Sequence, residues 1–291
     1  MTLPSDRETP VPVLDLDDLE RNVDRLHDEY QAASPYPHIV IEDFLLPEVA
    51  KAAVVEFPPL EPEGWNNYLH VNERKFANTE PETWGPTLQR ILEELNSSRF
   101  VDFVGKLLDV EDLFADPSLE GGGLHQSSKG GFLNIHADFT VHPHNRNWQR
   151  RANIILYFNE EWKPEYGGDL ELWSTDMKTC VEKISPVANR AVIFTTDATS
   201  FNGHPEPMRC PEDVARRSLA LYYFSEEVDP VVRSTEYRAR PGDGAHAILI
   251  LADKHMLRAY DWMKRRLGIS DQFASKLLGY RDRMRRKGPR N

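Results

Sequence analysis

Cysteine is nearly absent from this sequence, which has only Cys180 and Cys210 among its 291 residues. Two thiols exclude a disulfide framework and a zinc site built from cysteine thiolates. The chain must therefore be stabilised by its own apolar core, and a chain of this length can bury one. We predict a protein of a reducing compartment, the cytoplasm.

The sequence also lacks long apolar runs and a surplus of basic residues. Nowhere do eighteen apolar residues follow one another, and the opening MTLPSDRETPVPVLDLDD is polar and acidic. This predicts neither a membrane-spanning helix nor a secretory leader. The formal net charge of -12 argues against nucleic acid and anionic membranes as partners, because both favour a basic face. Small molecules and cationic ligands remain candidates.

The chain divides into three parts by the spacing of its apolar residues. Residues 1–34 have a Pro-rich start and then apolar residues at helical spacing, which predicts an N-terminal helical lead. Residues 35–227 are expected to form the main domain, with one strand and three helices before its β core. Residues 228–291 contain apolar helical surface and a basic end. They predict a C-terminal helical extension, through which the chain could form a homo-oligomer.

Short strands separated by turn residues fill the stretch from about 121 to 227. They are FLNIHAD, ANIILYFN, GGDLELWS, CVEKISP, RAVIFTT and RRSLALYYF. Evenly spaced strands of this kind predict an antiparallel barrel or jelly roll, so the fold class is mainly β with flanking helices. The pair Gly167 and Gly168 predicts a hairpin turn.

The motif HAD carries two groups that could bind a metal. Residues two apart on a strand point to the same face, so His136 and Asp138 present an imidazole and a carboxylate together. His204 is expected in a turn after RAVIFTT and could supply a third ligand. Two histidines and one carboxylate suit Fe(II), leave positions open for reaction and favour an anionic, bidentate 2-oxo acid as co-ligand. The same three residues could instead be hydrogen-bonded barrel histidines and a turn-capping carboxylate.

A dicarboxylate ligand would bring a second carboxylate into the barrel, where it needs a cation. The strand RRSLALYYF begins with two arginines, and a guanidinium binds a carboxylate with two hydrogen bonds. If Arg216 points inward, Ser218 does too and leaves room for a ligand, whereas Arg217 would share its face with bulky groups. We therefore assign Arg216 to the carboxylate. The alternation of ANIILYFN lets Tyr157 add a hydroxyl to this site.

From Pro35 to Glu226 the sequence resembles the Fe(II)/2-oxoglutarate-dependent oxygenases, in particular the prolyl-4-hydroxylase-like branch. The segments that match, in order, are HAD, ILYFNEEW, YGGDLELW, RAVIFTTDATSFNGHPE and RRSLALYYF. The resemblance implies a double-stranded β-helix, a cupin-like jelly roll. It also implies that His136, Asp138 and His204 bind iron, and that Arg216 and Tyr157 bind 2-oxoglutarate; the strand alternation adds Ser218 to the co-substrate site.

The resemblance implies an enzyme that uses Fe(II), 2-oxoglutarate and O2 to oxidise a C–H bond. Hydroxylation is favoured because the carboxylate ligand, Asp138, is present; cyclisation, epimerisation and desaturation occur in relatives. We favour a small-molecule or amino-acid-like substrate over a protein. The alternatives are a peptidyl-prolyl or other protein hydroxylase, a 2-oxoglutarate sensor with slow turnover, and a cupin-like isomerase or ligand-binding module that does not use O2.

Other polar residues are candidates for the substrate or for ordinary structural roles. His125 and Gln126 precede the metal strand and could line the pocket or form hydrogen bonds in the core. The run HNRNWQRR is expected in a loop at the barrel mouth, where Arg146 and Trp148 could contact substrate or solvent. His142 and His144 flank Pro143 and are expected in solvent or near the substrate, not on the iron.

Overall fold

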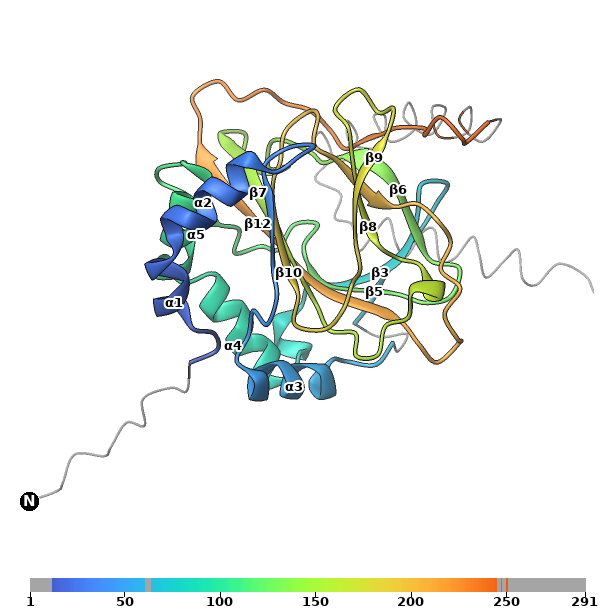
Figure 1. The fold of residues 1–291 in the computed structure, drawn as a ribbon, viewed down its shortest axis with the longest axis horizontal. Helices are drawn as coiled ribbons and strands as arrows, with labels where there is room; N and C mark the ends of the chain where they lie inside the picture. Colours follow the sequence, from blue (N-terminus) through green and yellow to red (C-terminus); the bar gives the residue numbers. More distant parts are fainter. Residues whose placement is uncertain (1–11, 61–63, 245–246, 248–249, 251–291) are drawn as a thin grey trace, which may run out of the picture.

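A computed structural model describes residues 12–60, 64–244, 247 and 250 (Figure 1). One curled antiparallel sheet dominates it, in the order β1-β10-β7-β12-β5-β3-β6-β11-β8-β9, with β2 on β3, β4 on β12 and β13 on β6. The predicted fold class, mainly β with flanking helices around a jelly-roll core, is confirmed. No helix in the described part of the chain is long and apolar enough to cross a membrane.

The strands coincide with the predicted short segments and add several more. They are β1 (His38–Ile41), β2 (Asn66–Leu69), β3 (Glu73–Asn78), β4 (Phe114–Ala115), β5 (Gly123–Ser127), β6 (Phe132–Ala137), β7 (Trp148–Tyr157), β8 (Leu170–Trp173), β9 (Cys180–Ile184), β10 (Ala191–Thr195), β11 (Phe201–His204), β12 (Arg216–Glu226) and β13 (Glu236–Tyr237).

The helices lie along one side of the sheet, at the left and bottom of Figure 1. They are α1 (Leu16–Arg21), α2 (Val23–Ala32), α3 (Pro47–Glu56), α4 (Pro86–Leu95) and α5 (Ser98–Leu108), with short 3-10 turns at Pro81–Thr83 and Pro164–Tyr166. Ser97 caps α5, because its hydroxyl accepts a hydrogen bond from the Phe100 amide at 3.2 Å. Pro47 and Pro86 begin their helices, where no amide donor is needed.

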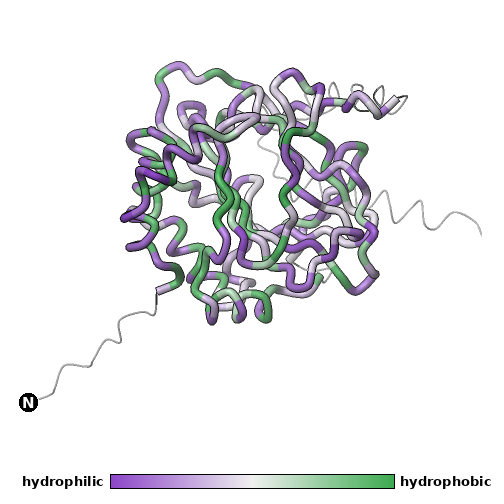
Figure 2. The backbone as a smooth tube through the Cα atoms, in the orientation of Figure 1, coloured by the Kyte–Doolittle hydropathy of each residue, from purple (hydrophilic) through white to green (hydrophobic). Residues whose placement is uncertain are grey.

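The core lies between these helices and the outer face of β7, β10 and β12. Leu219, Leu221 and Tyr223 of β12 join one apolar cluster with residues of all five helices, and Tyr223 donates its hydroxyl to the Leu95 carbonyl at 2.9 Å. Figure 2 shows green, hydrophobic stretches in the strands next to the helices. One face of the sheet thus packs against the helices, and the other face lines the interior of the barrel.

Several local predictions are wrong, and each error has a structural reason. The apolar residues at helical spacing in the N-terminal lead lie on two helices divided at Asn22, and not on one. Strand β7 begins at Trp148, so the second half of the predicted loop HNRNWQRR is strand. His204 ends strand β11, which pairs directly with β6, and does not lie in a turn. Gly167 and Gly168 form no hairpin, because β8 pairs with β9 and β11 and not with β7.

The predicted C-terminal extension is only partly described. Residues 228–244 include strand β13 and no helix. Almost all of the predicted C-terminal helices, and with them the predicted oligomer contact, lie outside the described residues. The N-terminal lead is not separate from the main core, since Leu26 and Tyr30 of α2 belong to the same apolar cluster as the sheet.

Candidate active site

His136 and Asp138 come together at the end of β6, as their spacing predicts. The His136 Nε2 atom lies 3.5 Å from Asp138 Oδ1. His136 Nδ1 donates to the Asn134 carbonyl at 2.9 Å, which keeps the lone pair on Nε2 when the ring is neutral. His136 is 6 % exposed. An imidazole nitrogen and a carboxylate oxygen therefore face each other in a buried place.

His204 reaches the same part of the barrel from the neighbouring strand. In the β6–β11 ladder, Asn202 is opposite His136 and His204 is opposite Leu133. Asn202 donates to Asp138 Oδ2 at 3.2 Å, and the register of the ladder shifts between Asn202 and His204. The His204 Nδ1 atom is buried and has no hydrogen-bond partner among the residues that the structure describes. Burial, and next the charge of Arg216, lowers the pKa of His204 well below its usual value.

The carboxylate of Asp138 is held by three side chains besides His136. Asn153 and Asn202 donate to Oδ2 at 3.0 and 3.2 Å, and Arg150 Nη2 lies 3.4 Å from Oδ1. Burial raises the pKa of Asp138, but Arg150 and His136 outweigh it, so that the pKa falls below its usual value. Asp138 is ionised at neutral pH.

The donor set can be tested against the metal that the sequence implies. Within the described residues, no three His, Cys, Asp or Glu side chains are gathered as closely as the ligands of one ion. The chemistry nevertheless fits Fe(II): an imidazole whose Nδ1 donates to a backbone carbonyl, an ionised carboxylate and a second histidine whose buried Nδ1 has no hydrogen-bond partner among the described residues. The two histidines and Asp138 therefore fit a metal ion by donor type and by burial. Arg150 and the side-chain amides of Asn153 and Asn202 hold the Asp138 carboxylate in place.

Arg216 points into the barrel and Arg217 points away from it. Arg216 is 6 % exposed; its Nη2 donates to the Tyr157 hydroxyl at 3.1 Å and its Nε to the Gly168 carbonyl at 2.8 Å. Ser218 is directly opposite Tyr157 in the β7–β12 ladder, on the same face. A guanidinium, a phenol and a hydroxyl therefore form one polar group that fits the distal carboxylate of a dicarboxylate.

His125 and Gln126 lie on opposite faces of β5. His125 is opposite Ser218 and therefore inside, whereas Gln126 is opposite Arg217 and accepts from its Nε at 3.1 Å. Within the described part of the chain, the buried His125 Nε2 atom has no hydrogen-bond partner. Burial, together with the charge of Lys75, lowers the pKa of His125 to about 3. His125 thus lies on the inner face of the sheet as a neutral imidazole, and Gln126 lies on the outer face.

The other polar candidates differ in their exposure to solvent. Arg146 is exposed in the turn before β7. The Trp148 ring packs edge-on against Phe114 at 4.9 Å and His142 at 5.2 Å. His142 was expected in solvent or near the substrate, but it is buried, with Nε2 3.5 Å from Asp116 Oδ2. His144 is exposed.

Sequence reasoning missed three residues next to the metal candidates. Arg150, expected in a loop, is 1 % exposed inside the barrel. Lys75 of β3 forms an ion pair with buried Glu73 at 3.2 Å. Tyr237 of β13 is opposite His136, and the two rings pack with centroids 5.4 Å apart. A short strand far along the chain leaves no local signal that it will pair with β6.

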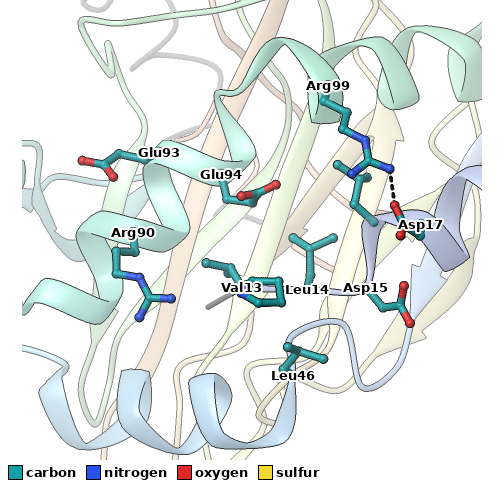
Figure 3. Close-up of a pocket in the computed structure, with 11 residues that line it drawn as sticks. Val13, Leu14, Asp15, Asp17, Leu46, Arg90, Glu93, Glu94 and Arg99 are labelled. Carbon is teal, nitrogen blue, oxygen red and sulfur yellow. Dashed lines mark hydrogen bonds and ion pairs between the residues drawn. The ribbon is translucent and has the colours of Figure 1, made fainter. Parts of the chain in front are cut away.

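A pocket of about 640 Å³ lies elsewhere, beside the N-terminal segment (Figure 3). Its lining comes from residues 12–17, the start of α3, and α4 and α5. Arg99 crosses it to bind Asp17, and its Nε donates to Glu20 Oε1 at 3.0 Å. None of the barrel residues described above lines this pocket, and the charges named here already have partners.

The part of the chain that contains these site residues is similar to a known protein family. Residues 122–224, which include all three candidate ligands and Arg216, match the 2OG-Fe(II) oxygenase superfamily. A prolyl-4-hydroxylase from Pseudomonas putida is 17% identical with a TM-score of 0.51, over 70% of this chain and 99% of that one. A prolyl hydroxylase from Trichoplax adhaerens, in complex with a peptide fragment of the oxygen degradation domain of hypoxia inducible factor, is 17% identical with a TM-score of 0.52, over 72% and 91%.

A more distant solved structure is that of HygX from Streptomyces hygroscopicus with nickel, 2-oxoglutarate and hygromycin B bound. It is 12% identical with a TM-score of 0.41, over 64% of this chain and 82% of that one. At these identities the similarities show the fold alone. No curated protein sequence matches the chain.

Proposed function

The β core of this chain belongs to the 2OG-Fe(II) oxygenase superfamily, and we propose that His136, Asp138 and His204 bind its Fe(II) while Arg216 binds 2-oxoglutarate. The protein is a non-haem iron dioxygenase with 2-oxoglutarate and O2 as co-substrates. Bound Fe(II) supplies the activation of O2 that couples decarboxylation of 2-oxoglutarate to oxidation of a substrate C–H bond.

One observation carries the assignment of residues: two separate polar groups lie on the inner face of one sheet. His136 and Asp138 pair at the end of β6, with His204 on the adjacent β11. Arg216 bonds to Tyr157 across β12 and β7. One group suits a divalent cation and the other a carboxylate, which are the two functions that an iron-bound dicarboxylate requires.

The residues of the chain have distinct roles in this proposal. The Asn134 carbonyl orients His136, and the amides of Asn153 and Asn202 hold Asp138 so that its carboxylate stays ionised and fixed. Tyr157 and Ser218 add hydroxyls beside the guanidinium of Arg216. Hydroxylation is the favoured outcome because an ionised carboxylate, Asp138, is retained as a ligand.

We propose a small-molecule substrate and a cytoplasmic location. The peptide in the Trichoplax structure belongs to that protein, and a 17% identity does not transfer it to this one. The two cysteines are free, in keeping with a reducing compartment.

The test is anaerobic titration followed by turnover. Fe(II) plus 2-oxoglutarate should give a weak visible charge-transfer band with the wild-type chain, and O2 should then give succinate. His136→Ala, His204→Ala and Asp138→Ala should each abolish succinate formation and weaken Fe(II) binding while far-UV circular dichroism is unchanged. His27→Ala, on helix α2, is the matched control. Wild-type turnover in any of the three variants refutes the ligand assignment; no band in the wild type favours the cupin-like ligand-binding module.

A further inference from the structure

Charge is divided unevenly along this chain. Residues 251–291 contain twelve Lys or Arg and only four Asp or Glu, although the whole chain has a formal net charge of -12. The other 250 residues therefore carry a formal net charge of -20. Opposite charges on one chain attract each other, most strongly at low salt. Because the two parts are joined covalently, each has a high effective concentration near the other, and a weak site is sufficient for binding.

The most basic part of the chain is YRDRMRRKGPR, residues 280–290, which we call the basic segment. It lies outside the described residues, and its sequence shows what kind of surface would bind it. It has six cations, one carboxylate and two larger apolar side chains, Tyr280 and Met284. Arg and Lys also have apolar stems below their charged ends. A complementary surface therefore has carboxylates beside an apolar floor.

The pocket beside the N-terminal segment has both features (Figure 3). Its apolar lining includes the side chains of Val13, Leu14 and Leu46, and its polar lining consists of four carboxylates and two guanidinium groups. Its volume of about 640 Å³ is in the range of ligand-binding pockets. The pocket can therefore hold several side chains of a peptide, and its excess of carboxylates favours a basic one.

Two of the four carboxylates have no partner in the described part of the chain. Asp17 binds Arg99, and Asp15 caps helix α1. Glu93 and Glu94 form no hydrogen bond or ion pair with any described side chain. Both lie in the last turn of α4, which has no basic residue there, and the dipole of a helix disfavours negative charge at that end. A cation beside Glu93 and Glu94 would be favourable for both reasons.

The basic segment is long enough and far enough along the chain to reach this pocket. Thirty residues lie between Ile250, the last described residue, and Arg281. Fully extended, they span about 100 Å. A compact chain of 291 residues has a radius of gyration of about 19 Å. The pocket is therefore within reach of the segment in the same molecule.

We infer that the basic segment binds in this pocket of its own chain. Its cations pair with Glu93 and Glu94, and the side chains of Tyr280 and Met284 contact the apolar floor. Single ion pairs at a surface contribute little, so the contact depends on several cations acting together and is released by salt. The inference concerns a surface outside the barrel and does not depend on the proposed function.

Carbodiimide crosslinking of the full-length chain tests this contact, because the reagent joins an amine directly to a carboxylate. Lys287 is the one lysine of the basic segment. Crosslinked peptides are identified by mass spectrometry in a mixture of isotope-labelled and unlabelled protein, which separates contacts within one chain from contacts between two chains. The rate at which trypsin cuts the basic segment is measured in parallel.

The variants are the double variant Glu93→Gln, Glu94→Gln and, as its matched control, the double variant Glu160→Gln, Glu161→Gln. The control changes a second pair of adjacent glutamates, which is exposed after β7. Glutamine keeps the size of the side chain and is a good helix former, so both variants should fold. Unchanged far-UV circular dichroism and Tm confirm this.

We expect Lys287 to crosslink to Glu93 or Glu94 within one chain at low salt. The yield should fall at least fivefold in 1 M salt, where charges are screened beyond about 3 Å. Trypsin should cut the basic segment about tenfold faster in the Glu93→Gln, Glu94→Gln variant than in the wild type, because cleavage follows the population of the unbound segment. The control variant should be cut at the wild-type rate.

Three outcomes would overturn the inference. Crosslinks of Lys287 to Glu93 or Glu94 that join two different chains would assign the pocket to a second copy of the protein. Crosslinks of Lys287 only to carboxylates elsewhere would place the basic segment on another surface. Equal tryptic rates in the two double variants would show that Glu93 and Glu94 do not hold it. Succinate formation should be unchanged in both variants, so none of these outcomes bears on the proposed function.

Discussion

Neighbouring residues of β12 have opposite surroundings, and this alternation decides which arginine can bind a ligand. Arg216 contacts Tyr157 and Gly168 inside the barrel. Arg217 lies over the Phe57 ring at 5.4 Å, and burial lowers its pKa. The Arg216 guanidinium can therefore bind a ligand inside the barrel, whereas the Arg217 guanidinium donates to Gln126 and packs against the core outside it.

Replacement of each arginine by methionine tests this difference. Arg216→Met should weaken 2-oxoglutarate binding by about a hundredfold, because a buried carboxylate loses its charged partner. Arg217→Met should change that affinity less than about threefold, since removal of a charge outside the pocket leaves the ligand contacts in place. The affinity is read from the charge-transfer band at saturating Fe(II). A larger loss in Arg217→Met would show that the register of β12 is wrong.

Gly168 supports Arg216 through its backbone, and its neighbour Gly167 is a matched control. Both have positive φ, +78° and +69°, so alanine strains each by about 1 kcal/mol. A Cβ on Gly168 would lie 2.9 Å from Met208 Sδ and 3.2 Å from Arg216 Cδ, whereas one on Gly167 meets no described residue within 4 Å. We expect a fall in Tm in both variants, and a larger one in Gly168→Ala because its Cβ also displaces Met208 and Arg216.

Only Gly168→Ala should also weaken 2-oxoglutarate binding, by about tenfold, because Arg216 must move from its place. Titration of the two purified variants with 2-oxoglutarate at saturating Fe(II) measures this. Equal affinities in Gly167→Ala and Gly168→Ala would show that the contact with Arg216 does not position it.

At the scale of elements, the short strand β13 covers the strand that carries the metal candidates. Glu236 and Tyr237 pair with Ala137 and His136. The Tyr237 ring is 5 % exposed and packs against both His136 and His70, at 5.4 and 6.0 Å. The segment after β12 therefore helps to orient His136, in addition to the Asn134 carbonyl.

Removal of this ring should loosen the metal site. Tyr237→Ala is expected to lower Fe(II) affinity by about tenfold, the range seen when groups that orient a metal ligand are lost. Tyr237→Phe keeps the ring and should restore most of the affinity. Anaerobic Fe(II) titration without 2-oxoglutarate separates this effect from co-substrate binding. Unchanged affinity in Tyr237→Ala would mean that β13 only covers the barrel.

At the scale of the whole molecule, buried histidines make stability depend on pH. The pKa of His125 is lowered to about 3 by burial and by Lys75, while in the unfolded chain it is near 6.5. Between these values the unfolded chain binds a proton that the folded one does not, so stability is lost as the pH falls from 6.5 towards 3. The contribution of this one proton is about 1.4 kcal/mol per pH unit.

His125→Gln should remove this part of the pH dependence. Denaturant unfolding of the metal-free protein at pH 7, 6 and 5 gives the free energy of unfolding at each pH. The wild type should lose about 1 kcal/mol more than the variant between pH 6 and 5. Parallel curves for the two proteins would show that His125 is protonated in the folded state.

The sequence by itself determined what depends on neighbours along the chain. The two-residue period of a strand places His136 beside Asp138 and separates Arg216 from Arg217, and this period holds wherever a strand is regular. The same alternation groups Arg217 with bulky side chains, which are Leu219 and Leu221, and these pack outside the barrel. The fold class and the 2-oxoglutarate chemistry followed from these local patterns and from the resemblance they carry.

Only the tertiary structure decided what depends on irregular strands and distant pairing. A register shift between Tyr223 and Phe224, opposite the stretch from Arg150 to Ala152, puts Arg150 inside together with Asn153, although a regular strand would put them on opposite faces. Strands β11 and β13 reach β6 from 60 or more residues away, and nothing in their own few residues specifies that partner. Short strands gain their stability from the sheet they join, so their sequence alone cannot fix their place.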